Sequence, residues 1–153
     1  MEEAKISILK SEMEAQIRVI DEIYKKIEIR KSAFEESQTN MESLAYQLHN
    51  LYCAFEDLFK IVADNFENTI EDKARYHIEL LRRMSIPIEG IRPPLLTEDA
   101  TRFFDELRSF RHLFRHAYSY EIDPRKLKIV LEDVQKLKNI YKNLVPKFIE
   151  KLK

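Results

Sequence analysis

The sequence predicts an all-α protein, an up-and-down bundle of about five helices in a single domain spanning residues 1–153. The chain contains one glycine, whereas sheets and hairpins usually need several glycines in their turns. Apolar residues recur at spacings of three and four over long segments, which is the period of an amphipathic helix. Four of the five prolines lie between Pro87 and Pro124, where they separate helices rather than interrupt them.

The first half of the chain predicts two long antiparallel helices. The first spans about residues 3–34, with an apolar stripe of Ile6, Leu9, Met13, Ile17, Ile20, Tyr24 and Ile27. A polar turn at residues 36–40 follows, with Thr39 or Asn40 as the expected N-cap of the next helix. That helix extends to about residue 68, with an apolar face of Leu44, Leu48, Leu51, Phe55, Leu58, Val62 and Phe66. Cys53 lies just off this face, and we assign it to packing because no neighbour in sequence would activate its thiol.

The second half predicts shorter helices around one ordered loop. A helix is expected over residues 73–84, and the proline-rich segment 85–96 reads as the loop. Thr97 then caps a helix whose expected core face is Phe103, Phe104, Leu107, Phe110, Leu113 and Phe114. Asp123 and Pro124 start the last helix as N-cap and first helical residue. Its stripe is Leu127, Val130, Val134, Leu137, Tyr141 and Leu144, and Pro146 is expected to kink or end it.

Composition narrows the class of protein. The net charge of −1, from 26 basic and 27 acidic residues, argues against a nonspecific nucleic-acid coat protein, although a local basic site remains compatible with it. A single cysteine excludes an internal disulfide. The N-terminus lacks the features of a secretory signal, and no apolar run approaches the roughly 18 residues of a membrane span. We therefore expect a cytoplasmic protein with no membrane partner.

The segment RSFRHLFRHAYSY, residues 108–120, is the main candidate for chemistry. Arg108, Arg111 and Arg115 are spaced three and four apart, which predicts a ridge of guanidinium groups on the helix side opposite the phenylalanines. His112 is expected on the same side. No acid occurs between Glu106 and Glu121, so the cations would repel one another unless an anion binds them.

Arginine beside histidine suits the cleavage of an RNA phosphodiester. A base removes the 2′-hydroxyl proton, an acid protonates the departing 5′-oxygen, and a fixed cation stabilises the phosphorane. However, His116 follows Arg111 by five residues, which is about 140° around an unbroken helix. Either the helix ends near Arg115, or a second copy of the motif completes the site.

Two other interpretations of the motif remain open from spacing alone. The segment could be an ordinary polar helix face with partly buried histidines. His112 and His116, four residues apart, could also chelate zinc, but the sequence offers no obvious third ligand.

The pattern Arg111-x4-His116-x-Tyr118 resembles the Rx4–6H motif of HEPN domains, in the RxxxxHxY form of HepT toxins. The segments at 44–57, 92–94 and 105–123 are similar to the same group. The resemblance implies a dimeric helical bundle, and a metal-independent endoribonuclease that cleaves transfer or messenger RNA. It also implies the toxin half of a HEPN–MNT toxin–antitoxin module.

The resemblance further implies roles for individual residues. Arg111 and His116 would be catalytic, His112, Arg115 and Arg108 would bind the RNA backbone, and no metal or cofactor would be required. The MNT nucleotidyltransferase antitoxin would transfer AMP to Tyr118, with Tyr120 as a secondary acceptor. A basic groove is expected from Arg82, Arg83, Arg92, Arg108 and Arg115. The alternative is a noncatalytic HEPN module that binds a nucleotidyltransferase.

Overall fold

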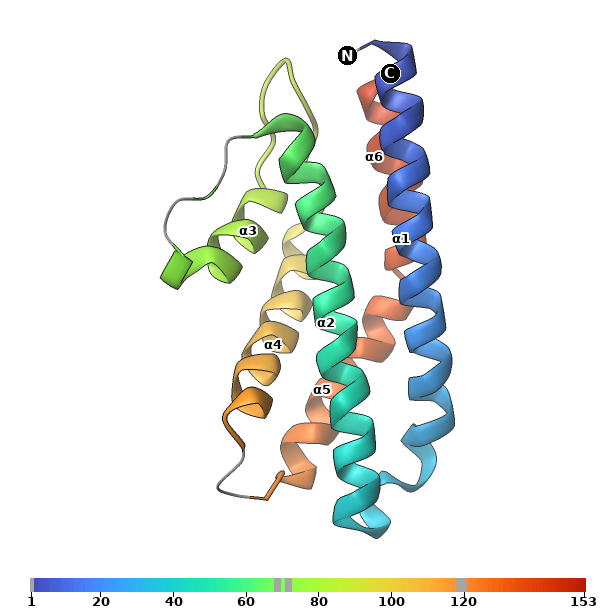
Figure 1. Cartoon of the computed structure of the whole chain (residues 1–153), viewed down its shortest axis with the longest axis vertical. Coiled ribbons are helices and arrows are strands. Elements are labelled where there is room, and N and C mark those ends of the chain that lie inside the picture. The colour runs from blue at the N-terminus through green and yellow to red at the C-terminus, as the bar shows by residue number, and fades with distance from the viewer. Residues whose placement is uncertain (1, 68–69, 71–72, 118–120) are drawn as a thin grey trace.

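The computed structural model describes residues 2–67, 70, 73–117 and 121–153, which form a helical bundle (Figure 1). Its helices are α1 (Glu3–Arg30), the 3₁₀ helix η1 (Lys31–Glu36), α2 (Gln38–Phe66), the 3₁₀ helix η2 (Lys73–Arg75), α3 (Tyr76–Met84), α4 (Glu98–Arg115), α5 (Pro124–Lys138), the 3₁₀ helix η4 (Tyr141–Asn143) and α6 (Leu144–Leu152). Within the described residues, the β-type pairing is confined to an isolated bridge between Ile88 and Arg92. The predicted all-α fold class is confirmed.

The two long helices α1 and α2 run antiparallel; α2 contacts α1, α3, α4 and α5, whereas α1 lies along one side of the bundle (Figure 1). The predicted stripe of α1 is buried except for Ile17, which is half-buried. Helix α6 packs along α1, and α4 packs against both α2 and α5. The C-terminal part of α4, which carries the Arg-His motif, therefore lies against α2.

The turn between α1 and α2 differs in detail from the prediction. Helix α1 ends at Arg30 rather than near Phe34, and the chain continues as the 3₁₀ helix η1, in which Ala33 has a non-helical backbone. The N-cap of α2 is Ser37 rather than Thr39 or Asn40, since the Ser37 hydroxyl accepts a hydrogen bond from the Asn40 backbone N–H at 3.0 Å.

The segment between α3 and α4 is an ordered loop, as predicted. Gly90 has a φ of +75° and allows the turn between Ile88 and Arg92. The Arg92 guanidinium donates hydrogen bonds to the backbone carbonyls of Arg83, Ile86 and Pro93, and it forms an ion pair with Glu67. Arg92 is 4% exposed and its guanidinium is engaged within the protein, so the prediction that it contributes to a basic groove is wrong.

Helix α4 begins at the predicted cap, where the Thr97 hydroxyl accepts a hydrogen bond from the Ala100 N–H. Phe104 is fully buried and meets Phe55 and Phe59 edge-on, at centroid distances of 4.6 and 5.2 Å. Leu107 and Phe110 are also buried, whereas Phe103, Leu113 and Phe114 are half-buried. This aromatic cluster fixes α4 on α2.

The C-terminal region forms two α-helices joined by a 3₁₀ turn, where the sequence predicted one helix. Asp123 caps α5 with Pro124 at the first helical position, as expected. Helix α5 ends at Lys138, and η4 leads into α6. The prediction that Pro146 kinks or ends the helix is wrong, because Pro146 lies in the first turn of α6, where a missing N–H breaks no helical hydrogen bond.

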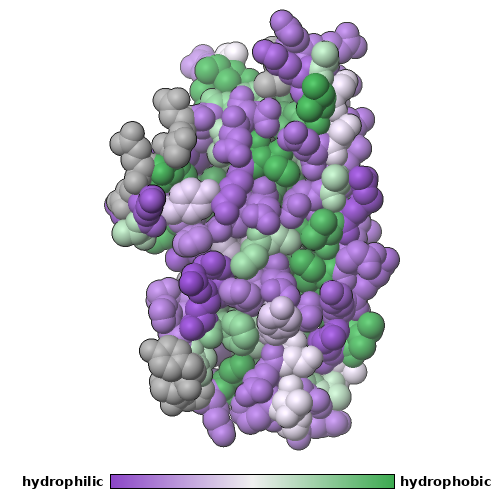
Figure 2. Space-filling model, in the orientation of Figure 1, coloured by the Kyte–Doolittle hydropathy of each residue, from purple (hydrophilic) through white to green (hydrophobic). Residues whose placement is uncertain are grey.

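The surface carries only scattered apolar side chains on the face shown in Figure 2. Over the described ranges, the large exposed hydrophobic residues are Ile8, Val19, Ile29, Tyr46, Ile78, Ile86, Ile91 and Ile129. Among the helices that the structure describes, none combines the length and apolar character needed to cross a membrane.

Candidate functional site

The Arg-His motif lies at the C-terminal end of α4, and the helix ends inside it. Arg115 is the last helical residue, and His116 is the C-cap, with φ −107° and ψ 10°. The His116 N–H donates to the Leu113 carbonyl at 3.2 Å, in the tightened last turn. The expectation that the helix ends near Arg115 is therefore confirmed. Tyr118 and Tyr120, the predicted acceptors of AMP, lie outside the described residues.

A row of polar residues on α2 faces this part of α4. His49, Tyr52, Cys53 and Glu56 are spaced three and four apart, so they share one side of α2. Tyr52 and Glu56 are buried, and Glu56 is held by the His77 Nδ1 of α3 at 2.6 Å. Burial, followed by the charge of Glu56, raises the pKa of Tyr52, while nearby Arg108 and Arg111 oppose that shift.

Arg111 contacts this row directly. Its Nε–H donates to the Cys53 Sγ at 3.4 Å, and the same sulfur lies 3.8 Å from the His49 Nε2. The His49 ring also packs against Phe114, with centroids 5.4 Å apart. Burial and the charges of Arg111 and Arg115 lower the pKa of His49, which favours the neutral imidazole. Arg111 thus lies toward α2, not on the side opposite the core as predicted.

Of the three arginines in the predicted guanidinium ridge, one forms an ion pair with an acidic side chain. Arg108 forms an ion pair with Asp105, one turn earlier, at 2.8 Å. In contrast, neither Arg111 nor Arg115 forms an ion pair with any residue that the structure describes. The positive charge available to an anion is therefore that of Arg111, which is half-buried, and Arg115, which is exposed.

The two motif histidines lie next to each other on the exposed side of α4. The rings of His112 and His116 are 4.7 Å apart. No contact between Arg111 and His116 occurs within the described part of the chain, because the two side chains leave α4 on different sides. Over the same residues, no group of three or more His, Cys, Asp or Glu side chains is arranged to hold a metal ion.

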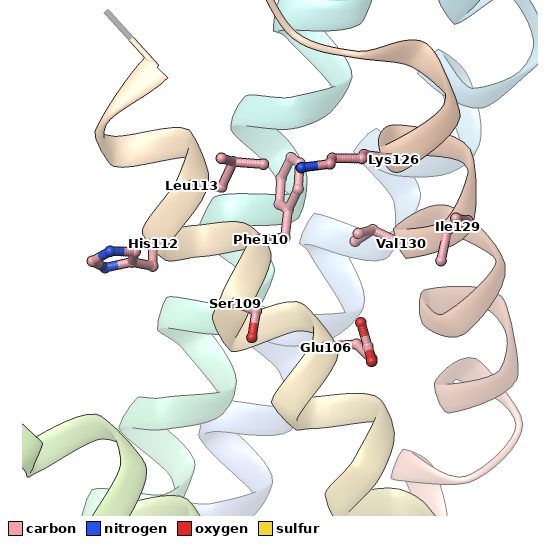
Figure 3. A pocket seen from close by; sticks show the side chains of 8 residues that line it. All are labelled: Glu106, Ser109, Phe110, His112, Leu113, Lys126, Ile129 and Val130. Atoms are coloured by element: carbon pink, nitrogen blue, oxygen red, sulfur yellow. The ribbon is translucent and has the colours of Figure 1, made fainter.

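A groove of about 400 Å³ separates α4 from α5 beside the motif (Figure 3). Phe110 and Leu113 from α4 face Val130 and Lys126 from α5, and Ile129 lies at its edge with 55% of its surface exposed. Its other lining residues are Glu106, Ser109 and His112. The groove is mainly apolar, with an acid on one helix and a base on the other.

Comparison with known proteins identifies the family. A family model described as HepT-like protein matches residues 43–152, from α2 to α6. The chain belongs to the HepT-like family. No curated protein and no solved structure matches the chain. The matched region includes both the Arg-His motif and the polar row of α2, and the predicted family is confirmed.

The basic groove predicted for this HepT-like chain is divided in the structure. Arg82 and Arg83 line a separate groove near Arg92 and Glu67, beside the loop between α3 and α4. Arg82 pairs with Glu79 at 3.1 Å, and Arg83 lies 3.6 Å from Glu67. The five arginines therefore do not form one surface, and the cations of the motif stand apart from this second group.

The residues of α2 that contact the motif are not identifiable from the sequence pattern. The sequence pattern assigns Cys53 to packing and does not single out His49. The contact of Cys53 with Arg111 joins positions 58 residues apart in the chain, which no local spacing reveals. The one available signal was that Cys53 and His49 lie on the same polar side of the HepT-like segment 44–57.

Proposed function

We propose that this protein is the toxin of a type VII HEPN–MNT toxin–antitoxin module, a metal-independent endoribonuclease that acts on transfer or messenger RNA in the cytoplasm. The observation that carries the proposal is an intact Arg111-x4-His116-x-Tyr118 motif in a HepT-like chain. Arg111 forms no ion pair with a described residue, and this supports the proposal. A guanidinium without a carboxylate partner can donate two hydrogen bonds to two oxygens of one phosphate.

The proposed chemistry needs two proton transfers and one cation. A base takes the 2′-hydroxyl proton, the 2′-oxygen attacks phosphorus, and the P–O5′ bond breaks as an acid protonates the departing 5′-oxygen. The products are a 2′,3′-cyclic phosphate and a 5′-hydroxyl. Arg111 stabilises the negative charge of the phosphorane, and His116 carries out proton transfer.

A homodimer would complete this site. Arg111 and His116 of one chain leave α4 on different sides, so a second copy is needed to bring both kinds of group to one phosphate. The groove between α4 and α5 supports such a contact, because its Glu106 and Lys126 allow a two-fold related copy to pair opposite charges. His112 and Arg115 would bind the RNA backbone, whereas Arg108 would contribute less because Asp105 neutralises it.

The dimer is tested by replacing Ile129, which is exposed at the groove. Ile129→Glu is expected to shift the protein from dimer to monomer in sedimentation velocity and to lower RNA cleavage, because it places a charge in an apolar contact. Ile29→Glu on α1 is the matched control, since Ile29 is 77% exposed and lies away from the groove. An unchanged dimer in Ile129→Glu would contradict this interface.

Control by the antitoxin would act at Tyr118. The Tyr118 oxygen would attack the α-phosphorus of ATP on the MNT nucleotidyltransferase, with pyrophosphate as the leaving group. The attached AMP adds a negative phosphodiester three residues after Arg115, where it would compete with RNA for the cations of the motif.

The activity is tested with purified RNA in the presence of EDTA. The parent protein, with unmodified Tyr118 confirmed by intact mass, is expected to cleave transfer or messenger RNA, and His116→Ala is expected to lose cleavage. Equal cleavage by both proteins would contradict the assignment of His116. Failure of the unmodified parent to cleave would favour a noncatalytic HEPN module that binds a nucleotidyltransferase, an alternative to which the net charge of −1 lends some support.

A further inference from the structure

Among the described residues, the side chain that accepts a hydrogen bond from Arg111 is that of Cys53. The Arg111 Nε–H donates to its sulfur at 3.4 Å, and the two terminal Nη nitrogens have no partner among the described residues. The thiol is held in turn by His49 on the same helix, whose Nε2 lies 3.8 Å from the sulfur. Phe114 of α4 packs against the His49 ring, so both helices contribute to the arrangement.

We infer that Cys53, supported by His49, is a positioning residue that holds Arg111 by its Nε edge and leaves the Nη end for the RNA phosphate. This inference rests on the proposed function, because it assigns a role within the same reaction. Neither residue needs to touch the substrate. Their effect would pass through the orientation of Arg111.

The chemistry of the acceptor explains why a thiol suits this position. An arginine side chain has several rotatable bonds, so a fixed acceptor reduces the disorder that binding must overcome. A carboxylate would hold the guanidinium more strongly, but it would also neutralise the charge that the phosphate requires. A neutral thiol is a weak acceptor that orients the group and leaves its charge intact.

The nearest acid on this side of α2 is already engaged elsewhere. Glu56 lies three residues after Cys53, and its carboxylate accepts from the His77 Nδ1 at 2.6 Å and lies 4.0 Å from the Lys60 Nζ. His77 and Lys60 thus compete for a carboxylate that could otherwise bind a motif arginine. His49, kept neutral, adds no negative charge to the contact either.

The inference is tested by a double-mutant cycle on RNA cleavage by the full-length protein. Cys53→Ala is expected to lower kcat about fivefold, as for the loss of one hydrogen bond, with KM changed less than twofold. Cys53→Ser restores an oxygen acceptor and should recover most of the rate. In an Arg111→Lys background, which lacks the Nε–H of the guanidinium, Cys53→Ala should have no further effect.

Ser43→Ala is a matched control on the same helix. The Ser43 hydroxyl accepts from the Arg30 Nε at 2.9 Å, so this variant removes a similar contact away from the motif. Its kcat should equal that of the parent. A Cys53→Ala rate equal to the parent, or an equal loss in the Arg111→Lys background, would overturn the inference.

A second readout does not depend on catalysis. Hydrogen exchange of the Arg111 Nε–H, followed by NMR and assigned with Arg111→Lys, should be slowed in the parent and Cys53→Ser but fast in Cys53→Ala. Equal exchange in the parent and Cys53→Ala would overturn the inference while leaving the ribonuclease proposal standing. A parent protein that protects this proton but cleaves no RNA would refute the proposed function, and with it the catalytic role of the contact.

Discussion

Two arginines, Arg92 and Arg111, are held by side chains at the C-cap of α2 and within α2 respectively, and these partners differ in charge. Arg92 is 4% exposed, pairs with the Glu67 carboxylate and donates to three backbone carbonyls. Arg111 is half-buried and donates to the sulfur of Cys53, with no ion pair among the described residues. The comparison teaches that the charge of the partner side chain distinguishes the two roles. An arginine paired with a carboxylate holds a loop, whereas an arginine without an ion pair keeps its charge available to a ligand.

Removal of Arg92 is the largest effect expected on stability. Arg92→Met should lower the free energy of unfolding by about 3–5 kcal/mol, because it leaves Glu67 buried without its main partner. Urea denaturation followed by circular dichroism measures this change. Arg102→Met is the control, since Arg102 and its partner Asp99 are both exposed and such pairs contribute about 0–1 kcal/mol. A loss of less than about 1 kcal/mol in the free energy of unfolding of Arg92→Met would contradict the structural role assigned to Arg92.

Converting the partner of Arg111 into a carboxylate sharpens the comparison. Cys53→Asp should lower RNA cleavage roughly 10- to 100-fold, because the new charge neutralises a group that acts on the transition state. Cys53→Asn has nearly the same shape without the charge, and it should cleave within about fivefold of the parent. Rates measured at fixed ionic strength separate the two variants, and equal rates would show that the charge of Arg111 is not needed.

The smallest expected effect is a pH dependence of stability that arises from His49. Its folded-state pKa lies below the ordinary 6.5, so the unfolded chain binds more protons between those two values. The free energy of unfolding should therefore fall as the pH decreases from about 6.5 to the folded-state pKa. Lys31 holds the pKa of Glu28 at about 2, so that carboxylate alters stability only below its ordinary 4.5.

His49→Gln tests this assignment. The variant removes the titrating ring, so the slope of unfolding free energy against pH should flatten between pH 5.5 and 6.5. Thermal or urea unfolding at three pH values in this range is sufficient. A slope equal to that of the parent would mean that burial and the charges of Arg111 and Arg115 do not lower the pKa of His49.

Some features set by neighbours in sequence were predictable, although the N-cap of α2 at Ser37 was not, and features set by distant contacts were missed. The caps at Thr97 and Asp123 follow from local backbone chemistry, whereas the end of α4 near Arg115 was one of two alternatives that the spacing of the motif left open. Arg92 was placed in a basic groove because its ion pair with Glu67 joins positions 25 residues apart. Cys53 was assigned to packing because its contact with Arg111 depends on how α4 lies against α2.

The end of the last helix illustrates a different limit. Proline is a reliable helix breaker only in a helix interior, and the sequence did not reveal that a new helix starts two residues before Pro146. The break after Lys138 depends on how η4 places Tyr141 in the core, where its ring stacks on Tyr24 at 4.8 Å. Packing of α1 against the C-terminal helices thus determined a boundary that local propensity did not.

The most direct test of the account compares Arg111→Ala with the parent protein in two assays. RNA cleavage in EDTA should fall at least about 100-fold, as for the loss of a group that stabilises the transition state. The free energy of unfolding should change by less than about 1 kcal/mol, because Arg111 has no ion pair to lose among the described residues. Undiminished cleavage by Arg111→Ala, or a loss of cleavage accompanied by unfolding, would contradict the account.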